Sequence, residues 1–349
     1  MNLSSLIYFS RLYGADPELV TCGGGNTSMK EGNVMYVKGS GTALKDAVTE
    51  TFVGMNRDKL MNMLNEDYPE EDAAREAKFV RDCAAAKLPG EENKRPSVEA
   101  LLHALFPQKY VLHLHPALVN GLTCSRNGEA ECKRLFGDSV VWVPACKPGY
   151  TLAKIMKDVF DKAERLVKTV LLENHGVFFG AETVEDLGTH LNGMMNALRS
   201  CVKELPDVES NAEDPGFGDK IRAVTGKEFV RFNASPTALS FAESAAAAAP
   251  VMKPFNPDQI VYCGAKVKFA NCVNCLNEID ANVIYMKGTG VYTVGDTAKN
   301  ADNAMTLVKD AMKVATYAKA FGGEKPMDPA LVDFIVGWEV ESYRKSVNK

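Results

Sequence analysis

Residues 111–116, with the sequence Val-Leu-His-Leu-His-Pro, determine both the fold and the chemistry that we predict for this chain. The apolar residues around His113 favour a strand, which Pro116 ends. Side chains two positions apart on a strand point to the same face, so His113 and His115 should project side by side. Two adjacent neutral imidazoles are a suitable start for a divalent metal site.

A third histidine offers a further ligand. The chain has five histidines, and His175 closes the apolar run 170–172 and precedes Gly176, in the stretch 170–179 that we predict as one strand. The alternative is that His113, His115 and His175 are core residues, each satisfied by a backbone hydrogen bond. A pair on one face of a strand together with a third histidine favours the metal, and we predict that these three bind one ion.

The composition excludes several classes of protein. A length of 349 residues exceeds what one hydrophobic core usually serves, so two domains are expected. The net charge of −5 gives no sign of the basic surface that binds nucleic acid. No apolar run approaches the ~20 residues that span a bilayer. Nine cysteines without a framework spacing favour reduced thiols in the cytoplasm.

A glycine-rich loop precedes the histidine strand. Residues 21–28 read Thr-Cys-Gly-Gly-Gly-Asn-Thr-Ser, and a predicted strand then leads to Lys38. Adjacent glycines let successive N–H groups turn toward one point, and the polar side chains add donors, which suits a phosphate. The alternative is a flexible hairpin loop, and no pattern here implies a nucleotide. The predicted phosphate contacts are Gly25, Asn26, Thr27, Ser28 and Lys38.

A carboxylate lies close to the histidines in sequence. Pro96 and Ser97 open a predicted helix, with Ser97 as its N-cap and Glu99 in its first turn. A carboxylate beside a metal, with a shifted pKa, can move a proton during a reaction. We therefore predict Glu99 as the proton-handling residue. His103, one turn further along, is expected to pack or to support the ligands.

An acidic, turn-rich segment, 206–218, is the predicted domain boundary. The domains expected on either side are 1–208, which holds the metal and phosphate residues, and a smaller α/β domain at 219–349.

The second domain has the features of a degenerate repeat. Residues 283–290 nearly repeat 34–41, and the same stretch read onward also mirrors 172–178. We interpret the second domain as a copy of a strand–glycine–strand–helix unit. Because no histidine follows His190, this copy cannot form a second triple-histidine site.

Two local features of the second domain carry separate expectations. Residues 260–262, Ile-Val-Tyr, are predicted as a strand. Cys272 and Cys275 form a single Cys-x-x-Cys. Half a zinc site or a redox pair are alternatives, and without a second pair nearby we predict ordinary buried thiols.

Five motifs occur in a characteristic order along the chain. They are Gly24-Gly25-Asn26-Thr27-Ser28, Lys38-Gly39-Ser40-Gly41, Pro96-Ser97-Val98-Glu99, His113-Leu114-His115-Pro116 and Asn174-His175-Gly176. Over residues 1–205 the chain resembles the class II aldolase/adducin family, which includes the fuculose- and rhamnulose-phosphate aldolases. The remainder resembles the region after the aldolase unit in fused rhamnulose-phosphate aldolase/dehydrogenase proteins.

The resemblance implies a fold and a set of site residues. The fold is a three-layer α/β/α arrangement around a largely antiparallel or mixed sheet, with a smaller related α/β domain after it. By position, the three histidines match zinc ligands, and Glu99 matches a glutamate that ligates the resting metal or acts as acid and base. The residues that match phosphate contacts are Asn26, Ser28, Ser40, Gly41 and Ser97.

The sequence departs from the family in two places. Val98 stands where the aldolases often have a second serine, which removes one hydroxyl from the phosphate pocket. The family's tyrosine after the Val-Pro strand has no clear equivalent in residues 145–150.

The predicted activity is that of a zinc-dependent aldehyde-lyase. It would cleave or form a C–C bond in a phosphorylated sugar through a metal-stabilised enediolate, and Co²⁺, Mn²⁺ or Fe²⁺ could replace zinc. An epimerase or a sugar-acid phosphate decarboxylase on the same scaffold is an alternative, and a non-catalytic, adducin-like scaffold protein is another. Family analogy also implies a homo-oligomer that takes part in carbohydrate metabolism.

Overall fold

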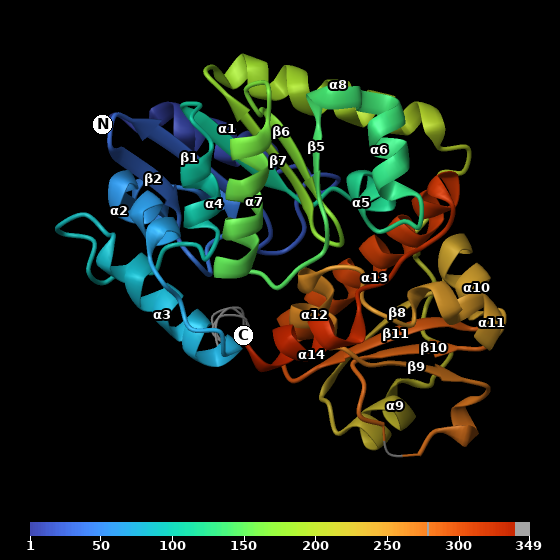
Figure 1. The fold of residues 1–349 in the computed structure, drawn as a ribbon. Coiled ribbons are helices and arrows are strands. Elements are labelled where there is room, and N and C mark those ends of the chain that lie inside the picture. The colour runs from blue at the N-terminus through green and yellow to red at the C-terminus, as the bar shows by residue number, and fades with distance from the viewer. Residues whose placement is uncertain (278, 339–349) are drawn as a thin grey trace. The chain divides into compact units, whose positions relative to one another are not determined.

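The strand that carries His113 and leads directly into His115 lies at the centre of a seven-stranded sheet. The computed structural model describes residues 1–277 and 279–338, and the strand order in this sheet is β3-β2-β1-β4-β7-β6-β5 (Figure 1). Neighbouring strands are antiparallel except for the parallel pair β5 and β6. The strands are β1 (Asn26–Glu31), β2 (Val34–Lys38), β3 (Phe52–Asn56), β4 (Tyr110–Leu114), β5 (Val141–Val143), β6 (Thr169–Leu172) and β7 (Gly176–Ala181).

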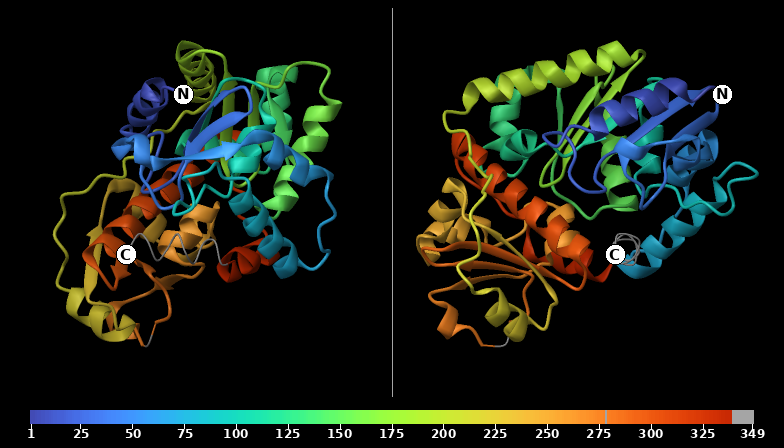
Figure 2. Two further views of the ribbon diagram at one scale, coloured as in Figure 1. Left: turned by 90° about the vertical axis from the view of Figure 1, so that its left-hand side faces the viewer. Right: turned by 180° about the vertical axis from the view of Figure 1, so that it is seen from behind.

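Helices cover both faces of this sheet (Figure 2). On one face, α2, α3, α4 and α7 bury side chains such as Phe79, Leu101 and Met156 in a common core with the strands. On the other face lie α1 and α8. This arrangement confirms the predicted layered α/β fold with a mixed sheet. The helices are α1 (Ser4–Gly14), α2 (Arg57–Asn62), α3 (Asp72–Ala85), α4 (Ala100–Leu105), α7 (Tyr150–Lys162) and α8 (Val184–Cys201).

A tight hairpin joins β6 to β7, where we predicted one continuous strand over 170–179. The turn places Asn174 in the left-handed region, at φ 56°, which asparagine tolerates better than most residues. Gly176 follows at the start of β7, where a Cβ atom would come within 2.4 Å of the Leu114 carbonyl oxygen. The chain reverses here, so His175 lies in the turn.

The described chain forms two compact units by its internal contacts. The first consists of residues 1–116 and 132–197, and the second combines 117–131 with the described part of 198–349. The domain boundary predicted at residues 206–218 stays a prediction. The segment 117–131, which holds α5 (Ala117–Thr123) and the start of α6 (Gly128–Phe136), thus belongs to the second unit.

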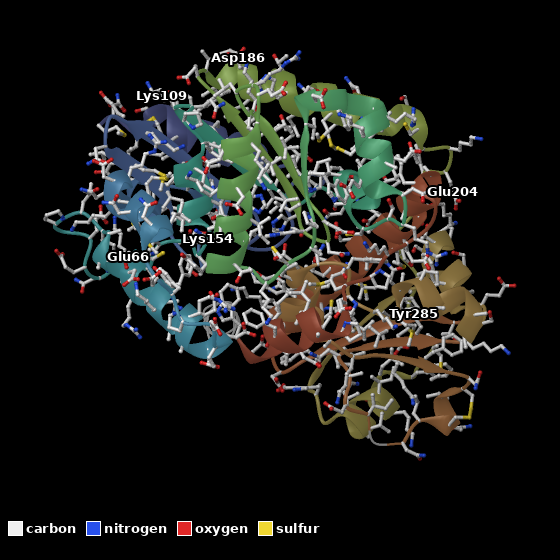
Figure 3. All side chains as sticks on the ribbon, in the orientation of Figure 1. Glu66, Lys109, Lys154, Asp186, Glu204 and Tyr285 are labelled. Atoms are coloured by element: carbon white, nitrogen blue, oxygen red, sulfur yellow. A yellow bond between two sulfur atoms is a disulfide. The ribbon has the colours of Figure 1, made fainter. Side chains whose placement is uncertain are left out.

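The second unit is built on a four-stranded sheet in the order β8-β11-β10-β9. Tyr285 of β10 lies in it and is only 1% exposed (Figure 3). The strands are β8 (Phe229–Asn233), β9 (Val267–Ala270), β10 (Val283–Met286) and β11 (Gly290–Gly295). The helices of 198–338 are α9 (Gly218–Thr225), α10 (Pro236–Ala242), α11 (Ala245–Ala248), α12 (Pro257–Cys263), α13 (Ala298–Ala318) and α14 (Pro329–Gly337).

This small sheet has the same topology as half of the large one. β8 pairs antiparallel with β11, β11 antiparallel with β10, and β10 parallel with β9. The set β4, β7, β6 and β5 shows the same directions in the same order. The hairpins also agree in register, because Leu172 pairs with Gly176 as Met286 pairs with Gly290.

Two local predictions for the second unit are wrong. Residues 260–262, predicted as a strand, lie in α12, because Asn256 caps the Gln259 N–H and Pro257 occupies the first turn. Cys272 and Cys275, predicted as buried thiols, form a disulfide in a single 3₁₀ turn, with Cys275 exposed. In the part of the chain that the structure describes, no helix has the length and apolar character needed to cross a membrane.

Candidate metal centre

Strand β4 and the β6–β7 turn bring the three predicted histidines together. His113 is fully buried and His115 is 8% exposed, while His175 is half-buried in the turn. One nitrogen from each ring lies within 4.8 Å of the others. The Nε2 atoms of His113 and His115 are 2.8 Å apart. Alternation along β4 accounts for the pair, and the hairpin supplies the third ring.

The surroundings of His113 fix which of its nitrogens faces the others. Its Nδ1 donates a hydrogen bond to the carbonyl oxygen of Val177 at 2.9 Å, so the lone pair of the neutral ring lies on Nε2, the atom that faces His115 and Glu99. Phe178 stacks on the ring with a centroid distance of 3.9 Å. Burial lowers the pKa of His113, which keeps the ring neutral. A neutral, oriented imidazole is the form that binds a metal.

Glu99 supplies an oxygen to the same point. It is the N-cap residue of α4, and its Oε1 lies 3.2 Å from His113 Nε2 and 3.3 Å from His175 Nε2. Asn26 donates a hydrogen bond from Nδ2 to Oε2. Burial opposes ionisation of this carboxyl, but its interactions with the three imidazoles outweigh burial and hold its pKa well below the usual range. The Glu99 carboxylate is therefore ionised where it faces the histidines.

These four residues fit a divalent metal ion. Three ring nitrogens and one carboxylate oxygen form an N3O donor set of the kind that zinc and its first-row neighbours accept. The buried His113 ring is already oriented by the Val177 carbonyl, and such support for a ligand is typical of metal sites. The donor set thus agrees with the chemistry predicted from the histidine pattern.

Part of the predicted phosphate set is also assembled. The end of β2 pairs with the turn before α4, because the Ser97 N–H donates to the Lys38 carbonyl at 3.1 Å and the Ser40 N–H donates to Arg95 at 2.9 Å. The Lys38 ammonium donates to the carbonyl of Gly23 at 3.3 Å. These bonds bring the glycine-rich loop, the Lys38–Gly41 segment and Ser97 together.

Gly25 connects that loop to the histidine strand. It adopts φ 70°, and a Cβ atom there would lie 3.0 Å from the His113 carbonyl oxygen. Its neighbour Asn26 opens β1 and pairs in register with His113. The loop therefore ends directly beside the metal centre.

Two predicted phosphate residues are occupied elsewhere. The side chains of Thr27 and Ser28 alternate across β1, and both residues are fully buried. The Thr27 hydroxyl lies 2.7 Å from Ser10 Oγ of α1, on the face of β1 opposite Asn26. Ser28 Oγ lies 2.8 Å from His103 Nδ1. Both hydroxyls thus contact other side chains, and a phosphate role for either residue stays a prediction.

Sequence reasoning missed the residues that support the ligands. Asn26 was assigned to phosphate, but its amide also holds Glu99, and neither the Val177 carbonyl nor Phe178 was anticipated. The signal for Phe178 is the register of β4 with β7, which places it opposite His113. That register becomes visible only when the strand pairing is known.

Comparison with known proteins identifies the family of this chain. A model of the Class II Aldolase and Adducin N-terminal domain matches residues 4–201, and the chain belongs to this family. The uncharacterized oxidoreductase YuxG of Bacillus subtilis (strain 168) is 34% identical over 194 residues, which cover 53% of this chain and 27% of YuxG. The chain therefore matches only about a quarter of the length of that relative.

Similar solved structures cover the same part of the chain. The N-terminal class II aldolase domain of a conserved protein from Thermoplasma acidophilum is 29% identical, with 57% of this chain and 93% of that chain covered and a TM-score of 0.49. L-Fuculose-1-phosphate aldolase from Thermus thermophilus is 15% identical, with 57% and 94% covered and a TM-score of 0.34. YgbL from Klebsiella pneumoniae is 18% identical, with 57% and 89% covered and a TM-score of 0.41.

Proposed function

We propose that this chain is a zinc-dependent aldehyde-lyase that cleaves or forms a C–C bond in a phosphorylated sugar. The observation that carries the proposal is the convergence of His113, His115 and His175 with Glu99 on one buried point. Membership of the class II aldolase and adducin family supports the same conclusion. A scaffold protein would have no need to keep this complete donor set.

The three histidines and Glu99 would hold the ion, with zinc as the first choice and Co²⁺, Mn²⁺ or Fe²⁺ as substitutes. When bound, the metal would supply the Lewis acidity that stabilises an enediolate. Glu99 contributes an ionised carboxylate that can accept a proton, and Asn26 fixes one of its oxygens so that the other faces the histidines.

The loop around Lys38 gives the substrate its orientation. The Lys38 ammonium donates to the Gly23 carbonyl and the Ser97 N–H donates to the Lys38 carbonyl, which brings the glycine-rich loop, Lys38 and Ser97 together. In this proposal they bind the phosphate of the substrate, with Ser40 and Gly41 at the end of β2 completing the set. Binding a group remote from the reacting carbons positions the substrate without taking part in bond making.

An epimerase or a sugar-acid phosphate decarboxylase would use the same donor set, and YgbL, a proposed aldolase, epimerase or decarboxylase, is among the similar structures. The reactions differ in their products. A lyase releases two carbon fragments, a decarboxylase releases CO₂, and an epimerase keeps every carbon.

The decisive experiment is a screen of ketose 1-phosphates and sugar-acid phosphates for metal-dependent cleavage. We expect aldehyde release that a chelator abolishes and that is lost in His113→Ala. His190→Ala is the matched control, because His190 lies on α8 outside the site, and it should keep full activity. Activity that survives both chelator and His113→Ala would overturn the proposal. Binding of less than about half an equivalent of zinc by the reconstituted protein would favour a scaffold role.

We further propose a cytoplasmic homo-oligomer that binds neither nucleic acid nor membrane. The net charge of −5 supports the first exclusion. The spacing of the nine cysteines shows no disulfide framework, which supports a reducing compartment. The oligomer rests on family analogy alone.

The second unit, in our proposal, is a degenerate copy of the β4–α8 half of the first. Both hairpins have a residue with positive φ at the same turn position, Asn174 and Gly288. Both also begin their second strand with a glycine whose Cβ atom would meet a neighbouring carbonyl at 2.4 Å. If the two hairpins are aligned by their register, Phe232, Ala234 and Thr289 correspond to His113, His115 and His175. The proposed activity therefore belongs to the first unit.

A further inference from the structure

Two side-chain hydrogen bonds join β1 to the first turn of α4. Asn26 donates from Nδ2 to Glu99 Oε2, and Ser28 Oγ lies 2.8 Å from His103 Nδ1. Asn26 and Ser28 are two residues apart on a strand and therefore share one face. Glu99 and His103 are four residues apart, and the His103 N–H donates to the Glu99 carbonyl at 3.0 Å. One helical turn thus carries both contacts, one at each end.

The sheet fixes the β1 side of these contacts. Ser28 pairs with Val37 of β2 on one side and with Val111 of β4 on the other. Asn26 pairs in the same register with His113. β1 therefore has a set position relative to the strand that carries His113. Helix α4 has only six residues, so contacts outside its own backbone decide where its first turn lies.

The His103 ring makes one hydrogen bond where it could make two. The residue is fully buried, and the ring of Phe178 meets it edge-on at a centroid distance of 5.4 Å. Burial holds the pKa of His103 well below its usual value, so the ring is neutral. Its Nε2 has no hydrogen-bond partner among the described residues. An apolar side chain would avoid the cost of that unpaired atom, so what the imidazole adds is its bond to Ser28.

The opposite face of β1 carries a hydrogen bond of the same kind. Thr27 Oγ1 lies 2.7 Å from Ser10 Oγ of α1, and both residues are fully buried. Helix α1 holds none of the four proposed metal ligands. A general loosening of β1 can therefore be distinguished from a specific loss of the Ser28–His103 bond.

We propose that the Ser28–His103 hydrogen bond positions Glu99, so that its Oε1 faces the histidines. This inference rests on the proposed metal site, and all of its residues belong to the first unit. Ser28 and His103 are positioning residues, because neither contacts the metal or the substrate in this proposal. They fix the far end of the turn that begins at Glu99, while Asn26 holds the carboxylate itself. Loss of a group that orients a metal ligand typically lowers metal affinity or activity about 10- to 100-fold.

The test uses the double variant Ser28→Ala/His103→Leu of the 349-residue chain. Both partners of the bond are removed together, so neither is left unpaired in the interior, and the melting temperature should stay close to that of wild type. His103→Asn is the rescue variant, because its amide can still donate to Ser28. Ser10→Ala is the matched control, since it removes the bond to Thr27 on the other face. Ser28→Ala alone repeats the test if the double variant does not fold.

We expect zinc to bind about 10- to 100-fold more weakly to the double variant, as measured by competition with a chromogenic chelator. Zinc affinity should stay within about twofold of wild type in Ser10→Ala and should be largely restored in His103→Asn. With the ketose 1-phosphate that the activity screen identifies, kcat should fall about 10- to 100-fold in the double variant. KM should stay within about twofold, because the loop around Lys38 is unchanged.

Four results would overturn the inference. If wild type binds zinc and the double variant binds it equally tightly, the bond does not position Glu99, and the proposed lyase stands. A rise in KM alone would show that Ser28 acts on the phosphate instead. Equal weakening of zinc binding in Ser10→Ala would show a general loosening of β1. If wild type binds no zinc at all, both the metal centre and the inference are wrong.

Discussion

The two carboxylate oxygens of Glu99 have different neighbours. The side chain could therefore either bind the metal or transfer a proton. Asn26 donates to Oε2, while Oε1 faces the imidazoles of His113 and His175. An oxygen held by an amide orients the carboxylate, and the other oxygen is left to contact the metal or to move a proton. The geometry suits either role, and a substitution that keeps the shape but removes the charge separates them.

Glu99→Gln is expected to lower kcat by about 10²- to 10⁴-fold, because an amide cannot accept the proton. Zinc should stay bound through the three histidines. The measurement is cleavage of the best ketose 1-phosphate alongside metal content. Full activity in this variant would show that Glu99 takes no part in the reaction. Complete loss of zinc would show that Glu99 serves chiefly as a metal ligand.

Asn174 gives a second prediction for a single residue. It holds φ 56° in the turn that presents His175. Asn174→Ala should lower the free energy of unfolding by about 1 kcal/mol, because alanine is strained in the left-handed region, and it should weaken zinc binding. Asn174→Gly is the matched control, because glycine adopts this φ without strain, and it should lose less stability and less zinc affinity than Asn174→Ala. Equal behaviour of the two variants would contradict this role for the turn.

At the scale of elements, the β6–β7 hairpin and β4 together form the centre. Gly176 lets the two approach, since a Cβ atom would lie 2.4 Å from Leu114 O and 2.7 Å from His115 Cδ2. The chain offers an internal control, because a Cβ atom at Gly290, in the β10–β11 hairpin, would meet Asn233 O at the same 2.4 Å. That hairpin carries no histidine.

Gly176→Ala and Gly290→Ala should both lower the melting temperature, because each methyl group meets backbone. Only Gly176→Ala should also weaken zinc binding, through displacement of His115. Differential scanning calorimetry and a chelator competition measure the two effects separately. A loss of zinc affinity in Gly290→Ala equal to that in Gly176→Ala would contradict the assignment of the metal to the first hairpin.

Local sequence patterns predicted some of these elements correctly and missed others. Alternation along a strand was enough to place His113 and His115 on one face, because that periodicity is a property of the backbone itself. The turn at Asn174 was missed, since apolar residues continue on both sides of it and mask the reversal. At residues 260–262 the apolar triplet suggested a strand, but the Asn256 cap and Pro257 start a helix. The Asn256 cap was therefore a better predictor of the structure here than the apolar triplet.

At the scale of the whole molecule, the stability of the chain should depend on Glu76. This α3 residue is 3% exposed, and burial raises the pKa of its carboxyl from 4.5 to about 7, with the Arg75 side chain offsetting part of the effect. The folded state then binds this proton more tightly than the unfolded state. The contribution to stability is full below pH 4.5 and is lost as the pH rises toward 7.

The pKa difference corresponds to about 3 kcal/mol in the free energy of unfolding. Urea denaturation between pH 4.5 and 7.5 should show this decline in wild type and a flatter profile in Glu76→Gln. Glu31→Gln, which changes an exposed acid, should follow wild type. Parallel profiles for wild type and Glu76→Gln would contradict the assignment.

The arrangement of the whole chain was harder to predict from the sequence than its motifs were. The likeness of residues 283–290 to both 34–41 and 172–178 left two alignments open, because short apolar strands before glycine are common. The strand pairing matches the β10–β11 hairpin to β6–β7. The membership of residues 117–131 in the second unit follows from contacts such as the Gly121–Tyr317 approach, which join distant parts of the sequence and which no local pattern reveals.

The central claim is that His113, His115 and His175 hold one metal ion with Glu99. The most direct test is anomalous diffraction at the zinc edge from crystals of the zinc-reconstituted protein. We expect one strong peak per chain, about 2.0–2.1 Å from a ring nitrogen of each histidine. The absence of a peak there, or a single peak at Cys272 and Cys275 instead, would contradict it.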